Sequence, residues 1–163
     1  MSAWNDRQLF SSASNEWGTP QALFDQVDAE FGFQLDAAAS DSNAKCARYL
    51  TAAQDALATS WSALADVVWC NPPYGRKVGE WVRKGYEEAQ LGCTVVMLVM
   101  ARTDTRWWHS YAMRATEVRF IKGRVHFTRS DGVTGPATAP SAVLVFTKSQ
   151  APPVVKGVEH ARR

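Results

Sequence analysis

Residues 65–100 read ADVVWCNPPYGRKVGEWVRKGYEEAQLGCTVVMLVM and carry the clearest structural pattern in the chain. The apolar run at 65–70 predicts a buried strand that ends at residues 71–75, because proline has no backbone N–H to donate to a sheet. Apolar side chains at helical spacing predict a helix over 78–91. The unbroken apolar run at 94–100 is typical of a strand that is covered on both faces of a parallel sheet. A strand, a helix and a strand in this order indicate an α/β fold.

A helix and a short strand are expected before residue 65. Thr19 and Pro20 are typical of a helix start, with Thr19 as the N-cap and Pro20 in the first helical position. Apolar residues then recur at intervals of four, and Gly32 predicts the end of this helix. Residues 33–36 read as a short strand. The stretch 37–49 is compatible with a loop or with a short helix.

The pattern after residue 100 predicts one helix and three strands. The helix is expected over 104–113, and the strands over 117–121, 124–127 and 141–146. Residues 128–140 are rich in Gly, Thr, Ser and Pro, which predicts a loop. The whole pattern is that of a mostly parallel central sheet with an antiparallel hairpin toward the C-terminus.

The length of 163 residues suits one domain. We expect this domain over residues 15–148, a flexible N-terminus over 1–14 and a flexible C-terminal tail over 149–163. No apolar run is long enough to cross a bilayer, and residues 1–10 lack the pattern of a signal peptide, so a cytoplasmic protein without membrane contact is expected. The three cysteines and three histidines have neither disulfide-framework nor metal-ligand spacing, so no metal is expected.

The net charge of +2 is unevenly divided along the chain. Residues 1–60 hold eight acids and three bases, whereas residues 101–130 hold seven bases and two acids. A basic segment of this kind is typical of a face that meets a polyanion, although a solvated basic helix and hairpin would give the same count.

Residues 71–74 supply the groups that would recognise a planar aromatic amine. Asn71 offers a side-chain carbonyl, and Tyr74 offers a flat ring for stacking. Pro72 and Pro73 fix the backbone and hold its carbonyls without a strand partner. Two acceptors beside an amino group favour the pyramidal geometry that this nitrogen adopts when its lone pair attacks. The alternative is an ordinary proline-rich turn after a strand.

Ligands of open α/β sheets bind beyond the carboxyl ends of the strands, which places Asp36 and Arg102 at the expected site. Asp36 is either a cofactor contact or a turn cap. Arg102, Asp104 and Arg106 either contact the phosphates of a polyanion or position its reacting group, or they form an Arg–Asp pair with Asp104 capping the next helix.

Six segments between Asn15 and Phe146 carry a further resemblance. They are Glu16-Trp17-Gly18-Thr19-Pro20, Phe33-Gln34-Leu35-Asp36-Ala37-Ala38, Asn43-Ala44-Lys45-Cys46, Val68-Trp69-Cys70-Asn71-Pro72-Pro73-Tyr74-Gly75, Ala101-Arg102-Thr103-Asp104-Thr105-Arg106-Trp107-Trp108-His109 and Phe120-Ile121-Lys122-Gly123-Arg124-Val125-His126-Phe127. In these segments the chain resembles the phage and prophage Dam-type DNA adenine-N6 methyltransferase family. The resemblance implies a reduced Rossmann-like methyltransferase fold, and methyl transfer from S-adenosylmethionine to the exocyclic amine of a flipped adenine in double-stranded DNA.

The resemblance also implies roles for individual residues. The catalytic group is the tetrapeptide Asn71, Pro72, Pro73 and Tyr74. The cofactor contacts are Trp17, Thr19, Pro20, Asp36, Ala37, Ala38 and Asp55. The DNA contacts are Arg102, Asp104, Arg106, Lys122, Arg124 and Arg129. We expect a phage- or prophage-encoded monomer or homodimer that acts in the cytoplasm of the bacterial host.

Two other functions share these features. A related methyltransferase would act on a glutamine amide or an RNA guanine amine, because Asn-Pro-Pro-Tyr suits those amines too. A relative without catalytic activity would keep the fold and bind DNA. The basic segment favours a nucleic acid over a protein target, and the chain has too few residues outside the core for a large recognition domain.

Overall fold

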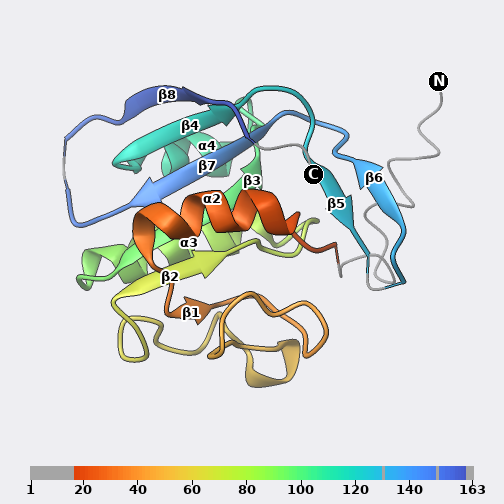
Figure 1. Cartoon of the computed structure of the whole chain (residues 1–163). Helices are drawn as coiled ribbons and strands as arrows, with labels where there is room; N and C mark the ends of the chain where they lie inside the picture. Colours follow the sequence, from red (N-terminus) through yellow and green to blue (C-terminus); the bar gives the residue numbers. More distant parts are fainter. Residues whose placement is uncertain (1–16, 130, 150, 161–163) are drawn as a thin grey trace.

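The computed structural model describes residues 17–129, 131–149 and 151–160 (Figure 1). The N-terminus expected to be flexible, residues 1–14, lies outside this part. In chain order the elements are α2 (Gln21–Phe31), β1 (Leu35–Asp36), η2 (Ala52–Gln54), β2 (Val67–Cys70), α3 (Val78–Gln90), β3 (Thr94–Met100), α4 (Arg106–Ser110), η3 (Ala112–Arg114), β4 (Glu117–Ile121), β5 (His126–Thr128), β6 (Thr134–Pro136), β7 (Ser141–Phe146) and β8 (Val154–Val158).

The central sheet has six strands in the order β1-β2-β3-β7-β4-β8. The pairs β1–β2, β2–β3 and β4–β8 are parallel, and β7 lies antiparallel between β3 and β4. The strands β5 and β6 form a separate antiparallel hairpin that projects from the sheet (Figure 1). The expected mostly parallel sheet with a hairpin is confirmed, and it is consistent with a Rossmann-like methyltransferase fold.

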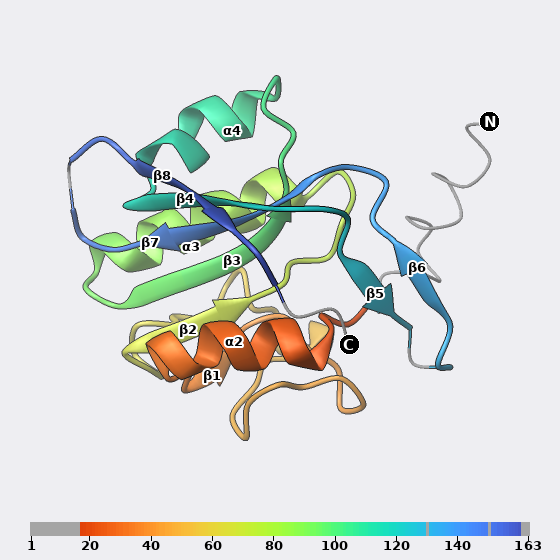
Figure 2. The same cartoon turned by 45° about the horizontal axis from the view of Figure 1, so that its top comes forward.

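Helices cover both faces of this sheet, as Figure 2 shows. On one face α2 packs through Leu23, Phe24 and Val27 against a cluster that includes Trp69 and Val96. On the other face the core side chains are those of the alternate strand positions, and α3 and α4 lie over them. Because neighbouring side chains of a strand point to opposite faces, a buried central strand needs apolar residues at every position.

Two expectations about the C-terminal third are wrong. The segment 128–140, predicted to be a loop, contains the strand β6: β4 joins the central sheet, and β5 pairs with β6. Gly123 lies between β4 and β5 with a φ of 79°, a left-handed conformation that turns the chain out of the sheet. The expected tail also contains β8, which runs parallel to β4 at the edge of the sheet.

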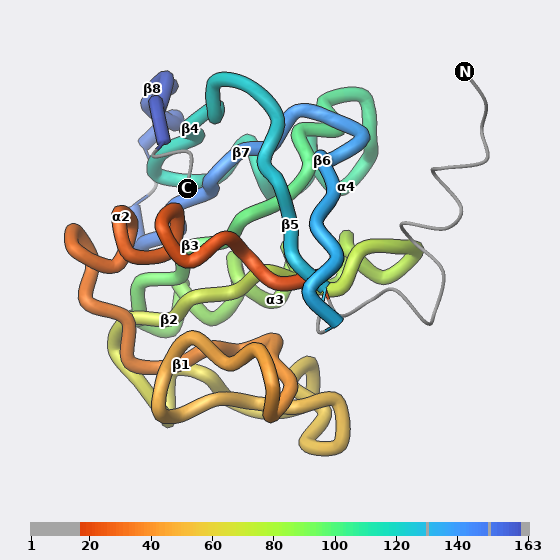
Figure 3. The backbone as a smooth tube through the Cα atoms, turned by 45° about the vertical axis from the view of Figure 1, so that its right-hand side comes forward, coloured from red at the N-terminus to blue at the C-terminus, as the bar shows by residue number. Residues whose placement is uncertain are grey.

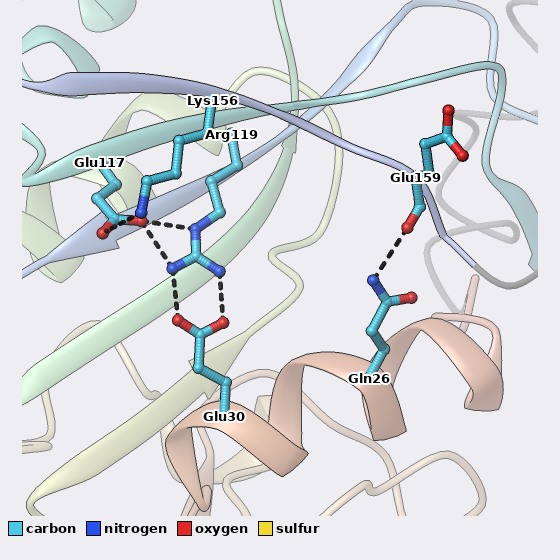
Figure 4. A network of polar contacts seen from close by, with 6 residues as sticks. All are labelled: Gln26, Glu30, Glu117, Arg119, Lys156 and Glu159. Atoms are coloured by element: carbon cyan, nitrogen blue, oxygen red, sulfur yellow. Dashed lines mark hydrogen bonds and ion pairs between the residues drawn. The ribbon is translucent and has the colours of Figure 1, made fainter.

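Polar contacts hold the β4–β8 edge against α2 (Figure 4). The guanidinium of Arg119 on β4 donates to both oxygens of Glu30 at 2.6 and 2.7 Å and to Glu117 at 2.7 Å. Lys156 on β8 donates to the same Glu117 at 3.0 Å. Beside this network, the Gln26 amide donates to the main-chain carbonyl of Glu159 at 3.0 Å. These contacts explain why residues 154–158 are ordered in the sheet although their side chains are mostly exposed.

Two helix starts differ from expectation. Pro20 is the N-cap of α2, and the Thr19 side chain makes no capping bond. The helix α4 starts at Arg106 and not at residue 104, and its cap is Thr105, whose hydroxyl accepts from the backbone N–H of Trp108 at 3.3 Å. The predicted capping role of Asp104 is therefore wrong.

Replacing Arg119 by Met should lower the free energy of unfolding by about 2 kcal/mol, because Glu117 loses a charge-assisted hydrogen bond in a half-buried position. The measurement is urea denaturation near neutral pH. The matched control is Arg83→Met, which removes an exposed pair with Glu87 on α3 and should cost much less, because solvent screens this pair. Equal losses in the two variants would contradict a special role of the Arg119 network.

Candidate active site

Segments from three parts of the chain line one cavity at the carboxyl ends of β1 and β2. The cavity has a volume of about 910 Å³, and its walls come from residues 17–19, 36–57 and 69–81. The long loop after β1 forms one side of it, below β1 in Figure 3. The segment before α2 also pairs with the β5–β6 hairpin, since the N–H of Gly18 donates to the carbonyl of Thr128 at 2.7 Å. The cavity lies where the α/β topology predicts a ligand.

The side chain of Asn71 is held from two sides. Its Nδ2 donates to the main-chain carbonyl of Trp17 at 3.2 Å, and its Oδ1 accepts from the Tyr74 hydroxyl at 3.2 Å. A carbonyl oxygen has two lone pairs, so Oδ1 retains one for a further donor. Burial raises the pKa of Tyr74 well above its usual value, which keeps the phenol neutral. The pair therefore presents one oriented acceptor beside one aromatic ring.

A second cavity of about 410 Å³ lies on the other side of the Asn-Pro-Pro-Tyr turn. Tyr74, Gly75 and Arg76 border both cavities, while Met100 and Trp107 line only the second. The Trp107 ring is seated close to α3: a Cβ added at Gly79 would lie 3.0 Å from the Trp107 Cβ. The Phe127 ring packs edge to face against the Tyr74 ring, with 5.8 Å between the ring centroids. A third cavity beside these two rings has a volume of only about 20 Å³.

Asp36 is buried in the wall of the first cavity, with 2% of its surface exposed. Its Oδ1 accepts from the N–H of Ala38 at 3.2 Å, and its Oδ2 accepts from the N–H of Lys45 at 3.0 Å. Burial raises the pKa of this carboxyl to about 6, against the lowering effect of these two bonds. The side chain thus organises the loop after β1, and its contact with a cofactor stays a prediction.

Most of the other predicted cofactor residues also line the first cavity: Trp17, Thr19, Ala37, Ala38 and Asp55. Pro20 is not among the lining residues. The Thr19 hydroxyl and the indole N–H of Trp17 are buried without a hydrogen-bond partner in the described part of the chain. Asp55 is exposed and has a φ of 46°, so it ends η2 in a left-handed conformation. Of the predicted catalytic group, Pro72 is buried and is not among the lining residues, while Pro73 lines the cavity.

The predicted DNA contacts fall into two groups. Arg102 and Arg106 are exposed after β3 and, within residues 17–129, 131–149 and 151–160, have no ion pair; Asp104 is exposed beside them. Lys122 pairs with Glu159, and Arg129 pairs with Asp131. Arg124 is exposed near the hairpin. The Arg–Asp pair considered for Asp104 does not form.

Three basic residues at the site carried no predicted role. Lys45 lines the first cavity, and its ammonium donates to Gln21 Oε1 at 2.8 Å. Arg76 and Lys77 are exposed and follow the Asn-Pro-Pro-Tyr turn directly. The sequence feature that could have identified Lys45 as a site residue is its place in the Asn43–Cys46 segment. For Arg76 and Lys77 this feature is their position just after the Asn-Pro-Pro-Tyr turn.

No group of three His, Cys, Asp or Glu side chains in the described residues could hold a metal ion. Cys46, Cys70 and Cys93 are free thiols. Within the same residues, none of the helices combines the length and the hydropathy needed to cross a bilayer.

The fold is consistent with that of a Rossmann-like methyltransferase. The family model described as DNA N-6-adenine-methyltransferase (Dam) matches residues 7–158, and the chain belongs to this family. The expected family is thus confirmed. Methyltransferases of this family generally use a methyl donor of the S-adenosylmethionine type.

Two phage proteins described as DNA N-6-adenine-methyltransferase are similar to the chain. The protein of Escherichia phage T1 is 28% identical over 142 residues, which cover 86% of this chain and 57% of the phage T1 protein. The protein of Haemophilus phage HP1 is 28% identical over 142 residues, which cover 83% of this chain and 80% of the HP1 protein. The chain thus matches little more than half of the phage T1 protein.

Asp36 should give the protein a distinctive pH dependence of stability. A carboxyl whose pKa is raised on folding contributes stability that is present at low pH and is lost as the pH rises through its folded value. The free energy of unfolding of the wild type, minus that of Asp36→Asn, should therefore fall by at most about 3 kcal/mol between pH 4 and pH 6 and then stay level. Urea denaturation across this range is the measurement.

Glu30→Gln is the control with the opposite sign. The hydrogen bond from Arg119 lowers the pKa of Glu30, so its contribution is present above the unfolded pKa and is lost as the pH falls. The free energy of unfolding of the wild type, minus that of Glu30→Gln, should therefore rise with pH. Parallel curves for the two variants would contradict the assignment at Asp36.

Proposed function

We propose that the chain transfers a methyl group from S-adenosylmethionine to the exocyclic amine of a flipped adenine in double-stranded DNA. The observation that carries the proposal is that Tyr74 lines both cavities and Asn71 lines the first, in a chain that matches the family over residues 7–158. In this proposal the protein is encoded by a phage or prophage and acts in the cytoplasm of the bacterial host, as a monomer or homodimer.

The chemistry of the first cavity supports S-adenosylmethionine as its ligand. This cofactor combines an adenosine, a sulfonium and an amino acid end, so it needs apolar contact as well as donors and acceptors. The cavity offers aromatic and alanine side chains, the carboxylates of Asp36 and Asp55, and the hydroxyl of Thr19, which has no hydrogen-bond partner among the described residues. When bound, the cofactor supplies the methyl group on a sulfonium, a leaving group that requires no metal.

The second cavity supports a flipped base as its ligand. Its walls combine the ring of Tyr74 with Trp107 and Met100, and its volume of about 410 Å³ can hold a purine, unlike the 20 Å³ space beside Phe127. Asn71 Oδ1 accepts one hydrogen of the amino group, and the main-chain carbonyl of Pro72 accepts the other. Tyr74 stacks on the base and fixes its plane. These contacts align the nitrogen with the methyl group, and alignment supplies much of the rate.

The cations around the second cavity support DNA as the partner. Arg76 and Arg102 line the cavity, and Lys77 and Arg106 are exposed close by in the sequence. Among the residues that the structure describes, none of the four forms an ion pair, and the Arg102 guanidinium donates only to the Met100 sulfur at 3.6 Å. Charges without an ion pair are free to replace the counterions of phosphates. Lys122 and Arg129 would have to give up ion pairs within the chain to do the same. We therefore assign the main phosphate contacts to the Arg76–Arg106 group.

Asn71→Ala should lower the rate of methyl transfer by about 100- to 1,000-fold, because the developing charge on the nitrogen loses an oriented acceptor. Affinity for S-adenosylmethionine should stay within about twofold. The assay incubates labelled S-adenosylmethionine with adenine-unmethylated DNA and analyses the nucleosides.

Asn71→Asp, which keeps an acceptor, is the matched control and should retain more activity than the alanine variant. An unchanged rate for Asn71→Ala would overturn the mechanism. Labelled protein or RNA with unlabelled DNA would favour the glutamine amide or guanine amine as the target, and cofactor binding without any transfer would favour an inactive relative.

Neutralising Arg102 and Arg106 together, each by Gln, should weaken DNA binding and reduce the slope of log K against log salt concentration by about 1 to 2. The double variant Lys122→Gln and Arg129→Gln removes the same charge from ion-paired positions and should change the slope by less than about 1. Fluorescence anisotropy with a labelled duplex at several salt concentrations measures both. The reverse ranking would place the DNA at the hairpin and not at the second cavity.

A further inference from the structure

Two backbone hydrogen bonds tie the segment before α2 to the β5–β6 hairpin (Figure 3). The N–H of Gly18 donates to the carbonyl of Thr128 at 2.7 Å, and the N–H of Thr128 donates to the carbonyl of Gly18 at 3.1 Å. One planar peptide unit joins residues 17 and 18. It contains the N–H that donates to Thr128 and also the Trp17 carbonyl that accepts from Asn71 Nδ2 at 3.2 Å. Because this unit is rigid, its bond to β5 fixes the direction of that carbonyl.

The contact between Gly18 and Thr128 leaves little room for a side chain. A Cβ added at Gly18 would lie 3.3 Å from the carbonyl oxygen of Thr128 and 3.9 Å from the Cβ of Asn43. Glycine therefore allows the two backbones to approach this closely. A larger residue at position 18 has to shift the peptide unit or β5 by a few tenths of an ångström.

The strand β5 also reaches the other partner of Asn71. The Phe127 ring is 4% exposed and packs edge to face against the Tyr74 ring, with 5.8 Å between the centroids. Both Tyr74 and Trp17 pack against the apolar cluster to which Phe127 belongs. The Tyr74 hydroxyl donates to Asn71 Oδ1 at 3.2 Å. Two neighbouring residues of β5 thus hold the groups on both sides of the Asn71 amide.

These two groups define one orientation of the amide. The Trp17 carbonyl can only accept a hydrogen bond, so it requires Nδ2 of Asn71 on its side. Rotation of the amide would bring Oδ1 to this carbonyl, and two acceptors cannot form a bond. The orientation that places Oδ1 as the acceptor beside Tyr74 therefore depends on the position of the Trp17 carbonyl.

We propose that β5 is the positioning element of the Asn71 amide and acts through the Gly18–Thr128 pair and through Phe127. The inference rests on the proposed function, since it gives that amide a role in methyl transfer. Gly18, Thr128 and Phe127 are positioning residues, because each acts on the reaction through Trp17 or Tyr74. The competing role of the same contacts is to anchor the hairpin to the domain, without an effect on the amide.

The kinetic test is single-turnover methylation of adenine-unmethylated DNA with cofactor and DNA both saturating, so that the rate does not report binding. Gly18→Ala and Phe127→Leu should each lower this rate by about 5- to 20-fold, and Gly18→Val should lower it further, because small displacements of a reacting geometry are costly. In an Asn71→Ala background the same substitutions should change the rate by less than about twofold, since the amide is absent. Equal fold losses in both backgrounds would overturn the inference.

Two matched controls separate positioning from a general loosening of the fold. Gly157→Ala adds a methyl group on β8, where a Cβ meets no heavy atom within 4 Å. Phe33→Leu truncates a ring that packs against the same apolar cluster and contacts Trp69. Both should keep the rate within about twofold of the wild type. Losses as large as those of Gly18→Ala and Phe127→Leu would contradict a special role of β5.

A second measurement does not require catalysis. The side-chain N–H signals of Asn71 in an NMR spectrum are identified by their absence in Asn71→Ala. Their hydrogen exchange should become at least about fivefold faster in Gly18→Ala and in Phe127→Leu, and should stay unchanged in Gly157→Ala. Unchanged exchange in both of the first two variants would overturn the inference. Wild-type protein that forms no methyladenine would overturn the proposed reaction, while the exchange rates would still decide whether β5 holds the amide.

Discussion

The structure depends on the burial of β2 on both faces and on its abrupt end. Trp69 is 1% exposed against α2, while Val68 and Cys70 are fully buried under α3. Two prolines then remove two backbone donors, so the chain has to leave the sheet at residue 71. Because β1 and β3 run parallel to β2, their carboxyl ends meet at the same edge. The proline turn therefore fixes where both cavities form: Asn71 and Tyr74 line the first, and Tyr74 also lines the second.

The elements that sequence reasoning predicted closely are those whose own residues determine them. The strands 94–100 and 141–146 are continuous apolar runs, and their predicted bounds agree with the structure. The helix α3 was predictable from its own apolar periodicity, and its observed end lies one residue before the predicted end. By contrast, β8 has mostly exposed side chains, and only β4 and the Arg119 network order it. Its existence depends on partners far away in the chain, which a local pattern does not reveal.

The same distinction applies to the site. The rule for strand ends places Asp36 and Asn71 at one edge, and both line the first cavity as this rule predicts. Nothing local shows that Lys122 is neutralised by Glu159, because this pair spans 37 positions, whereas Asp131 lies only two positions after Arg129. The hydrogen bond that holds the Lys45 ammonium likewise joins it to Gln21, 24 positions earlier. Sequence identifies the charged residues, but tertiary structure decides which charges stay available.

The bond that orients Asn71 has a consequence for the tolerance of this site to mutation. Its acceptor is the main-chain carbonyl of Trp17, which every amino acid at position 17 would supply. Replacement of the indole changes the wall of the cavity but leaves this acceptor in place. The orientation of the Asn71 amide thus does not depend on the side chain at position 17, and only a displacement of the backbone before α2 can remove this bond. The wall of the first cavity can therefore vary at this position while the orientation of Asn71 is kept.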